Sequence, residues 1–276
     1  MRNLGSMAVL ICVVVAIALV GASTAAASVG VNCVKPFDFV SKDQDLTNCK
    51  MNGVTIPGSN LPGDAMQGSN FTGASLNGAT IGVGVVDETL RDTNMTNASM
   101  VGVTIGGITT FDSAGLPGAT LKNSIIGGTD AFVAANLSGD DLKNIQIPTS
   151  SFSLAFQFAT LAGASLRGAS IAGDEAFNYA NLNGADLTGA TISANDAFST
   201  FAVTPPPTTT LVGASLVSAT ISGSDDFDFA DLTGANLTGA IVTGTNDFTG
   251  ALFSDTICPD GTNSDSNGFT CVGHGL

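Results

Sequence analysis

The chain has 276 residues and a formal net charge of −15, so its surface repels nucleic acid and anionic lipid, and an electrostatic partner should be cationic. With 34 glycines, no tryptophan and only 11% charged residues, the composition excludes an ordinary helical globular domain.

The first 27 residues have the pattern of a secretory leader. Arg2 precedes an apolar run over residues 7–20, and the small-residue stretch GASTAAAS follows, which predicts cleavage after Ala27. An uncleaved membrane anchor is the alternative, although the run is shorter than the roughly 20 residues that a spanning helix needs. We therefore expect a secreted protein, located outside the cell or in the cell envelope.

A period of five residues dominates the rest of the chain. In YANLNGADLTGATISANDAF, large apolar residues recur at Leu182, Leu187 and Ile192, and Phe198 follows one residue late. Residues five apart form no stripe on a helix and alternate between the faces of a strand. The spacing therefore predicts a chain that turns a corner every five residues, with glycine at tight corners, alanine sharing the interior, and Asn, Asp, Ser and Thr outside.

A longer period of 21 residues shows how many sides each coil has. Phe177, Leu182, Leu187 and Ile192 make one set, and the next set begins at Phe198. Identical residue types at this period predict columns of Phe, Leu, Leu and Ile along a four-sided solenoid of about ten coils. Upstream, the frame continues in degraded form from Leu46. It is interrupted by insertions at residues 57–65, 82–89, 148–155 and 202–210.

The units ANLNG, ADLTG and ANLTG resemble the pentapeptide repeat family over residues 46–253, and the ending CPDGTNSDSNGFTCV resembles the tail of secreted bacterial members. The resemblance implies an all-β fold, a right-handed quadrilateral parallel β-helix, and brings no family-wide catalytic residues. It also implies a second function, because some family members mimic DNA and act on DNA gyrase.

The predicted organisation is a leader over residues 1–27, an N-terminal cap over 28–45, the β-helix over 46–253 and a C-terminal cap over 254–276. Four cysteines remain after the leader is removed, which argues for two disulfides in an exported chain. Because the solenoid separates the two ends, we expect local pairing. The predicted pairs are Cys33 with Cys49 and Cys258 with Cys271.

The corner before each Phe is repeatedly acidic, and the sequence predicts that these carboxylates lie one above another in the last coils. They are Asp174, Glu175, Asp196, Asp225, Asp226 and Asp247. One interpretation is a ladder that binds a cation such as Ca²⁺. The other is a set of solvated turn residues whose side chains cap backbone N–H groups. No other cofactor is expected.

The tail offers a second, weaker cation pattern. Asn263, Asp265, Asn267 and Gly268 have the spacing of an EF-hand loop start, but position twelve is His274. A disulfide-closed cap with side-chain-stabilised turns is the alternative, and His274 is expected to be a mobile surface residue.

Aromatic residues two positions after the core Phe should point outward. They are Phe158, Tyr179 and Phe229, with Phe201 nearby, and they predict an aromatic strip for a protein or glycan unless the proline-rich insertion covers them.

The chain shows no pattern of a catalytic site, because no nucleophile set, zinc spacing or phosphate-binding loop occurs and the basic residues are scattered. We expect a non-enzymatic scaffold that binds an extracellular protein or glycan, not nucleic acid, and that is compatible with a homodimer. A DNA mimic and a carbohydrate-active enzyme are the alternatives.

Overall fold

The computed structural model describes residues 50–56, 58, 60–61, 66–81, 90–107, 110–127, 129–148, 154–172, 174–193, 195–198, 208–224 and 227–276. The predicted leader, the N-terminal cap, Cys33 and Cys49 lie outside these residues. No helix within them is long and apolar enough to cross a membrane.

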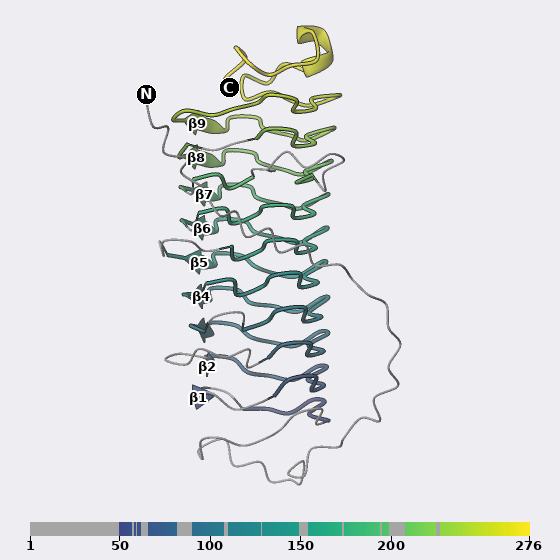
Figure 1. Ribbon diagram of the computed structural model, residues 1–276, viewed down its shortest axis with the longest axis vertical. Helices are drawn as coiled ribbons and strands as arrows, with labels where there is room; N and C mark the ends of the chain where they lie inside the picture. Colours follow the sequence, from purple (N-terminus) through teal and green to yellow (C-terminus); the bar gives the residue numbers. More distant parts are fainter. Residues whose placement is uncertain are drawn as a thin grey trace, which may run out of the picture.

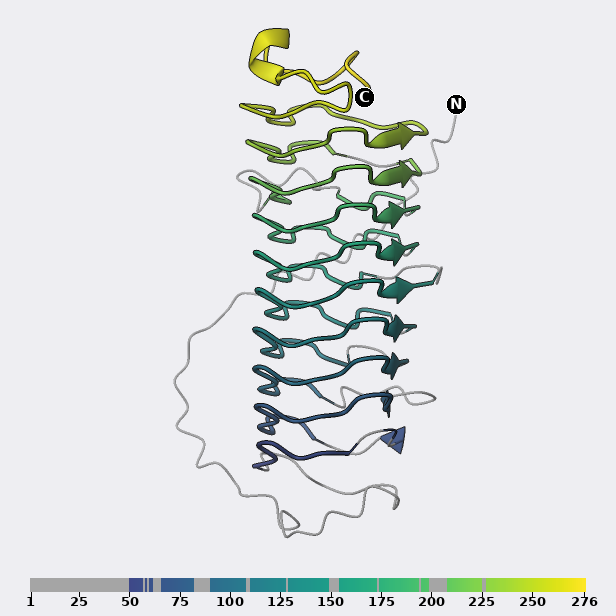
Figure 2. The same cartoon turned by 180° about the vertical axis from the view of Figure 1, so that it is seen from behind.

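The described chain is a parallel β-solenoid in which each coil adds one short strand to a single sheet. Figures 1 and 2 show the strands stacked on one side along the long axis, with the C-terminal tail beyond the last coil. The sheet order is β1 to β9 without crossover, and every pair is parallel. The strands are β1 Asn60–Leu61, β2 Thr80–Ile81, β3 Thr104–Ile105, β4 Ile125–Ile126, β5 Gln146–Ile147, β6 Ser170–Ile171, β7 Thr191–Ile192, β8 Thr220–Ser222 and β9 Ile241–Thr243.

Four columns of large side chains fill the interior, as the period predicted. In the Phe column, consecutive rings from Phe111 to Phe248 stack with centroids 4.8–5.5 Å apart. The first Leu column includes Leu116 and Leu182, the second includes Leu121 and Leu187, and the Ile column includes Ile192, all fully buried. A buried side chain of this size contributes about 1.5–3 kcal/mol, so these columns hold the fold together.

The corners of the coil follow the chemistry of the five-residue unit. Gly184 and Gly189 have φ of 66° and 67°, where a residue with a Cβ is strained. The alanine after each glycine is buried, as at Ala185 and Ala190. Outside, Asp186 Oδ1 accepts a hydrogen bond from the Thr188 N–H at 3.0 Å. The predicted roles of glycine, alanine and Asp in the repeat are therefore confirmed.

The first coil corrects the predicted frame. Thr55 pairs with Ser75, which places Ile56 in the second Leu column, whereas the strand residues Asn60 and Leu61 pair with Thr80 and Ile81. Residues 60–61 therefore continue the coil within the insertion that the sequence predicted at residues 57–65. The sheet has nine strands, compared with the expected count of about ten coils.

The C-terminal tail begins as a continuation of the coil and then turns back. Ile257 pairs in parallel with Asn236, which sets Cys258 above Leu237 in the second Leu column. Ile257 then pairs antiparallel with Asn263, and the short 3-10 helix η1 Ser264–Asn267 follows. The tail therefore reverses over the last coil, where the sequence placed a cap.

Candidate binding surface

The corner that follows the Phe column requires a left-handed backbone in every coil that the structure describes there. Gly68, Asp92, Ser113 and Ala134 occupy it in the earlier coils, and Gly250 occupies it in the last one, all with positive φ. Small residues and Asp tolerate this conformation, whereas for a bulky residue it is an outlier that costs of order 1–3 kcal/mol.

Three aromatic residues occupy this strained corner in the later coils, and we call them the aromatic corner. Phe158, Tyr179 and Phe229 have φ of 59°, 59° and 56°. Phe158 and Phe229 are 49% and 40% exposed. The predicted outward direction is therefore confirmed for these two residues. At this corner the chain has both a strained backbone and exposed large apolar side chains, and each of these features lowers its stability.

Neighbouring side chains hold the aromatic corner in place. The Phe158 and Tyr179 rings stack with centroids 5.0 Å apart and an interplanar angle of 7°. The Tyr179 N–H donates to Thr209 Oγ1 at 3.0 Å. The Phe229 ring lies so close to Gly250 that a Cβ added there would come within 2.6 Å of it. The predicted neighbour Phe201 and most of the proline-rich insertion lie outside the described residues.

Carboxylates lie at the corner that precedes the Phe column, on the opposite edge of the face that carries the aromatic corner. Glu175 and Asp196 occupy equivalent positions in consecutive coils. The Phe177 N–H donates to the carbonyl of Ala197, the residue before Phe198, and in the same way the Glu175 N–H donates to the carbonyl of Asn195, the residue before Asp196. Burial raises the pKa of both carboxyls, and the Asp196 charge adds to the rise in the pKa of Glu175. The buried Asn178 amide donates to Glu175 Oε2 at 3.0 Å.

Asp174 and Asp247, two other predicted members of the acidic ladder, do not lie in this column, which corrects their expected alignment. Asp174 lies beside Asn195, and its Oδ1 accepts from the Asn195 N–H and Nδ2 at 3.2 Å. Asp247 directly precedes a core Phe, so it takes the position of Ala197 and not that of Asp196. Its Oδ1 accepts from the Thr249 N–H at 2.8 Å. These two carboxylates cap backbone groups, as the alternative interpretation expected.

Asp225 and Asp226 lie outside the described residues. Within the described part of the chain, no three His, Cys, Asp or Glu side chains come together in a way that could hold a metal ion. Cation binding by the full ladder stays a prediction.

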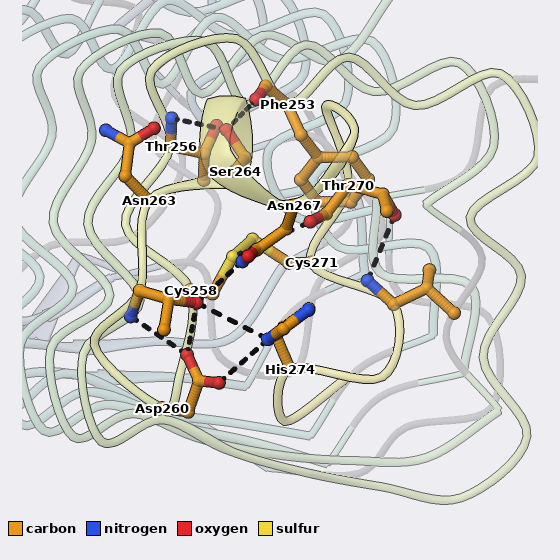
Figure 3. The surroundings of a disulfide bond; sticks show 12 residues. Phe253, Thr256, Cys258, Asp260, Asn263, Ser264, Asn267, Thr270, Cys271 and His274 are labelled. Atoms are coloured by element: carbon orange, nitrogen blue, oxygen red, sulfur yellow. Dashed lines mark hydrogen bonds and ion pairs between the residues drawn. A yellow bond between two sulfur atoms is a disulfide. The ribbon is translucent and has the colours of Figure 1, made fainter.

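The C-terminal tail is a disulfide-closed cap (Figure 3). Cys258 and Cys271 are bonded, as predicted, with Cα atoms 5.3 Å apart. Asn263 caps η1 by accepting from the Asp265 N–H at 2.9 Å, and Gly268 ends the helix in the left-handed region. Asp265 Oδ1 accepts from the Asp255 N–H at 2.7 Å.

Side chains of the EF-hand pattern stabilise turns of the tail, as the alternative interpretation expected, since those of Asn263 and Asp265 accept from backbone N–H groups. Asn267 Nδ2 donates to Thr262 Oγ1 at 2.7 Å. His274 is also anchored, contrary to expectation, since its Nδ1 lies 2.9 Å from Asp260 Oδ2 (Figure 3).

The structure also places three basic residues in one column, although the basic residues look scattered along the sequence. Lys122, Lys143 and Arg167 each come three residues before a strand, in three consecutive coils. The Asn123 N–H donates to the Lys143 carbonyl, and the Asn144 N–H donates to the Arg167 carbonyl, which sets the three residues one above another. Alignment by coil would have found them, because only the insertion after β5 breaks their spacing of 21 residues.

The fold and the repeating corners define a class of protein, the quadrilateral β-solenoids built from five-residue units. The family model for pentapeptide repeats matches residues 211–257 in eight copies. Residues 211–257 are thus pentapeptide repeats, as the sequence predicted.

Solved structures with similar folds include other pentapeptide repeat proteins. One is HetL from the cyanobacterium Nostoc, involved in heterocyst differentiation regulation, which is 21% identical with a TM-score of 0.29 over 80% of this chain and 94% of its own. Another is QnrB1, a plasmid-mediated fluoroquinolone resistance protein, which is 16% identical with a TM-score of 0.21 over 76% of this chain and 89% of its own. A search of curated proteins finds no match.

Proposed function

We propose that this protein is an exported, non-enzymatic scaffold whose aromatic corner binds a partner protein. The observation that carries the proposal is the placement of Phe158, Tyr179 and Phe229 in a left-handed backbone where other coils have Gly, Ser, Ala or Asp. Strained residues persist where they have a use, and exposed aromatic residues mark binding surfaces. A purely structural corner would favour glycine.

The partner's surface should be apolar and basic. The paired rings of Phe158 and Tyr179 each cover one face of the other, so the column offers mainly ring edges along its length. A sugar stacks on an open ring face, whereas an apolar protein side chain packs against ring edges equally well. The Glu175 and Asp196 carboxylates across the face, together with the net charge of −15, add an attraction for Lys and Arg.

Export is part of the same proposal. The pattern over residues 1–27 predicts a leader, and the Cys258–Cys271 bond suits an oxidising compartment. Sequencing the N-terminus of the protein recovered from culture medium should give Ser28. Recovery only from the cytoplasm with Met1 intact would contradict export.

Binding can be tested with arrayed synthetic peptides that combine Lys or Arg with Leu, Ile or Phe, beside an array of glycans. The variant Phe158→Ala/Tyr179→Ser copies Ala134 and Ser113, the residues that the two coils before Phe158 carry at this corner, and should keep the fold. We expect the wild type to bind basic apolar peptides, and the variant to bind at least about tenfold more weakly, a loss of about 1.4 kcal/mol.

A matched control changes an exposed apolar residue at another corner. Val212→Thr copies Thr233, which holds the same place one coil later, and should leave binding unchanged. Equal binding by the wild type and the aromatic variant would refute the role of the corner. Selective binding of glycans, lost in the variant, would replace the protein partner with a sugar.

A further inference from the structure

The face that carries β2–β9 has a surface unlike the rest of this acidic chain. We call it the Ile face. Its outward strand residues carry no charge between β2 and β9, and two of them are exposed isoleucines, Ile125 at 42% and Ile241 at 58%. The strands lie in register from coil to coil and form one continuous ladder (Figure 2). Its outward residues are Thr80, Thr104, Ile125, Gln146, Ser170, Thr191, Thr220 and Ile241.

Opposite charges border this uncharged face. The edge where the chain enters the strands carries Lys122, Lys143 and Arg167, which we call the basic edge. The edge where the chain leaves them carries Asp130, Asp174, Glu175 and Asp196, which we call the acidic edge. The two edges share coils, since Lys122 and Asp130 flank β4, and Arg167 and Glu175 flank β6.

This arrangement of charge is self-complementary under one symmetry operation. A two-fold axis parallel to the solenoid axis sets two Ile faces against each other with equal coils at equal height. Each basic edge then meets the acidic edge of the other copy, with Lys122 opposite Asp130 and Arg167 opposite Glu175, each twice. A two-fold axis parallel to the strands would instead bring like edges together and reverse the order of the coils.

We propose that the Ile face is a self-association surface, on which two copies of this chain pack in parallel around a two-fold axis along the solenoid. The occupant is a second copy because one surface supplies both charge patterns, at the same heights, around an uncharged centre. Symmetric dimers of this isologous kind are the commonest protein oligomers. The Ile face does not include the aromatic corner, but its acidic edge includes Glu175 and Asp196, which the proposed partner would also contact.

The basic residues can form these cross-pairs at little cost. Lys122 makes no ion pair within the described part of the chain. Arg167 NH1 lies 3.1 Å from Asp186 Oδ2, and Lys143 Nζ lies 3.5 Å from Asp141 Oδ1. Both pairs are exposed, and an exposed pair contributes only about 0–1 kcal/mol, so Arg167 can exchange its partner at little cost.

The dimer should be weak and sensitive to salt. Eight strands about 4.8 Å apart make a face only about 34 Å tall and one short strand wide. Interfaces at this small end of the range belong to transient complexes. Charges at its edges are screened over about 3 Å in 1 M salt but over about 30 Å in 0.01 M salt. Sedimentation equilibrium should therefore show a dimer at low salt that dissociates at high salt.

A charge-swap experiment on the purified protein tests the arrangement. Lys122→Glu/Arg167→Glu puts acidic residues opposite Asp130 and Glu175, and Asp130→Lys/Glu175→Lys puts basic residues opposite Lys122 and Arg167. Each variant alone should be monomeric at low salt, whereas an equimolar mixture should form heterodimers at least as tight as the wild-type dimer. Formation of the heterodimer also shows that both variants are folded, which matters because Asp130 Oδ1 accepts from the Leu154 N–H.

The control adds the same negative charge to the outer face of the first Leu column. Lys50→Glu/Asn136→Asp/Asn181→Asp changes the net charge as much as the acidic variant does, and Asp231 shows that Asp fits this column. The control should dimerise like the wild type, and Ser170→Tyr, at the centre of the Ile face, should not. A wild-type protein that stays monomeric at low salt, a mixture of swapped variants that stays monomeric, or a Ser170→Tyr dimer would overturn the proposal.

Discussion

Asp140 Oδ1 accepts a hydrogen bond from the backbone N–H of Ala119, one coil earlier and 3.0 Å away, inside the core. Asp140 is 1% exposed and is the only ionisable side chain buried among the described residues. The coils on either side carry Ala119 and Ala164 at this position, and Asp140 Oδ2 has no partner. Burial raises the pKa of this carboxyl from 3.8 to about 8.

The raised pKa makes the stability of the solenoid depend on pH. Between about pH 4 and pH 8 the folded chain holds a proton on Asp140 that the unfolded chain has released, so the free energy of unfolding falls as pH rises. Below this pH window the protonated Asp140 makes its full contribution to the free energy of unfolding. Above the window that contribution is lost entirely. Since one pKa unit corresponds to about 1.4 kcal/mol, the loss is on the order of 5 kcal/mol.

Asp140→Ala should remove this dependence and stabilise the protein at pH 8 while changing little at pH 4. The Ala119 N–H keeps its second acceptor, the Leu116 carbonyl at 2.8 Å, so the variant leaves no donor unpaired. Urea unfolding across this pH range measures the effect. Asp231→Asn, on the surface, is the control and should leave the slope as in the wild type. An unchanged slope in Asp140→Ala would show that Asp140 is not its source.

Core and corner aromatic residues should differ in their effect on stability. Phe177→Ala opens a cavity in the Phe column and should cost about 3–5 kcal/mol. Phe158→Ala removes a half-exposed ring from a strained backbone and should cost less than about 1 kcal/mol. Guanidinium unfolding of both variants measures the difference. Equal losses would mean that the aromatic corner is part of the core.

Loss of the disulfide should loosen the C-terminal cap first. Cys258 and Cys271 are 13 residues apart, and closing a loop of this size contributes about 3 kcal/mol. Cys258→Ala/Cys271→Ala should therefore lower the unfolding midpoint and speed amide exchange in the tail before it affects the Phe column. Peptide mapping of the oxidised protein tests the other predicted pair, Cys33 with Cys49. An unchanged midpoint in the variant would contradict the role of the bond.

Asp260 should titrate unusually low in the cap. The Thr262 hydroxyl and N–H donate to Asp260 Oδ1 at 2.6 and 2.9 Å, and with His274 they lower the pKa of the carboxyl to about 2. A lowered pKa stabilises the fold above about pH 4, and this contribution is lost as pH falls through about 2. Carboxyl NMR shifts should show this titration, and Thr262→Ala should raise it. A titration near 3.8 in the wild type would contradict the contacts.

The columns could be predicted from the sequence because burial restricts residue type. Phe177, Leu182, Leu187 and Ile192 repeat at fixed spacing, and no regular helix or strand explains that spacing. The failures share one cause, which is that insertions and corners of unequal length shift the frame. In the first coil, for example, residues 60–61 form the strand inside the insertion expected at residues 57–65.

The candidate surfaces were harder to predict, because surface function depends on which column a residue joins. Glu175 and Asp247 both precede a Phe, but by two residues and by one, and this single step puts them in different columns. Lys143 and Arg167 are 24 residues apart, so a count of 21 misses their alignment. Asp140 follows a glycine like its alanine counterparts, and only a comparison of coils reveals a carboxyl in the core.

The reversal of the chain after Cys258 has a consequence for the behaviour of this protein at high concentration. Parallel strands with like side chains above one another are also the arrangement of amyloid fibrils, and an open end of such a stack is a template for more strands. Here Ile257 pairs antiparallel with Asn263, and the Cys258 N–H donates to the Thr262 carbonyl. No parallel coil of a second molecule can continue the stack at this side while the disulfide locks the reversal, so reducing conditions should promote fibrillation.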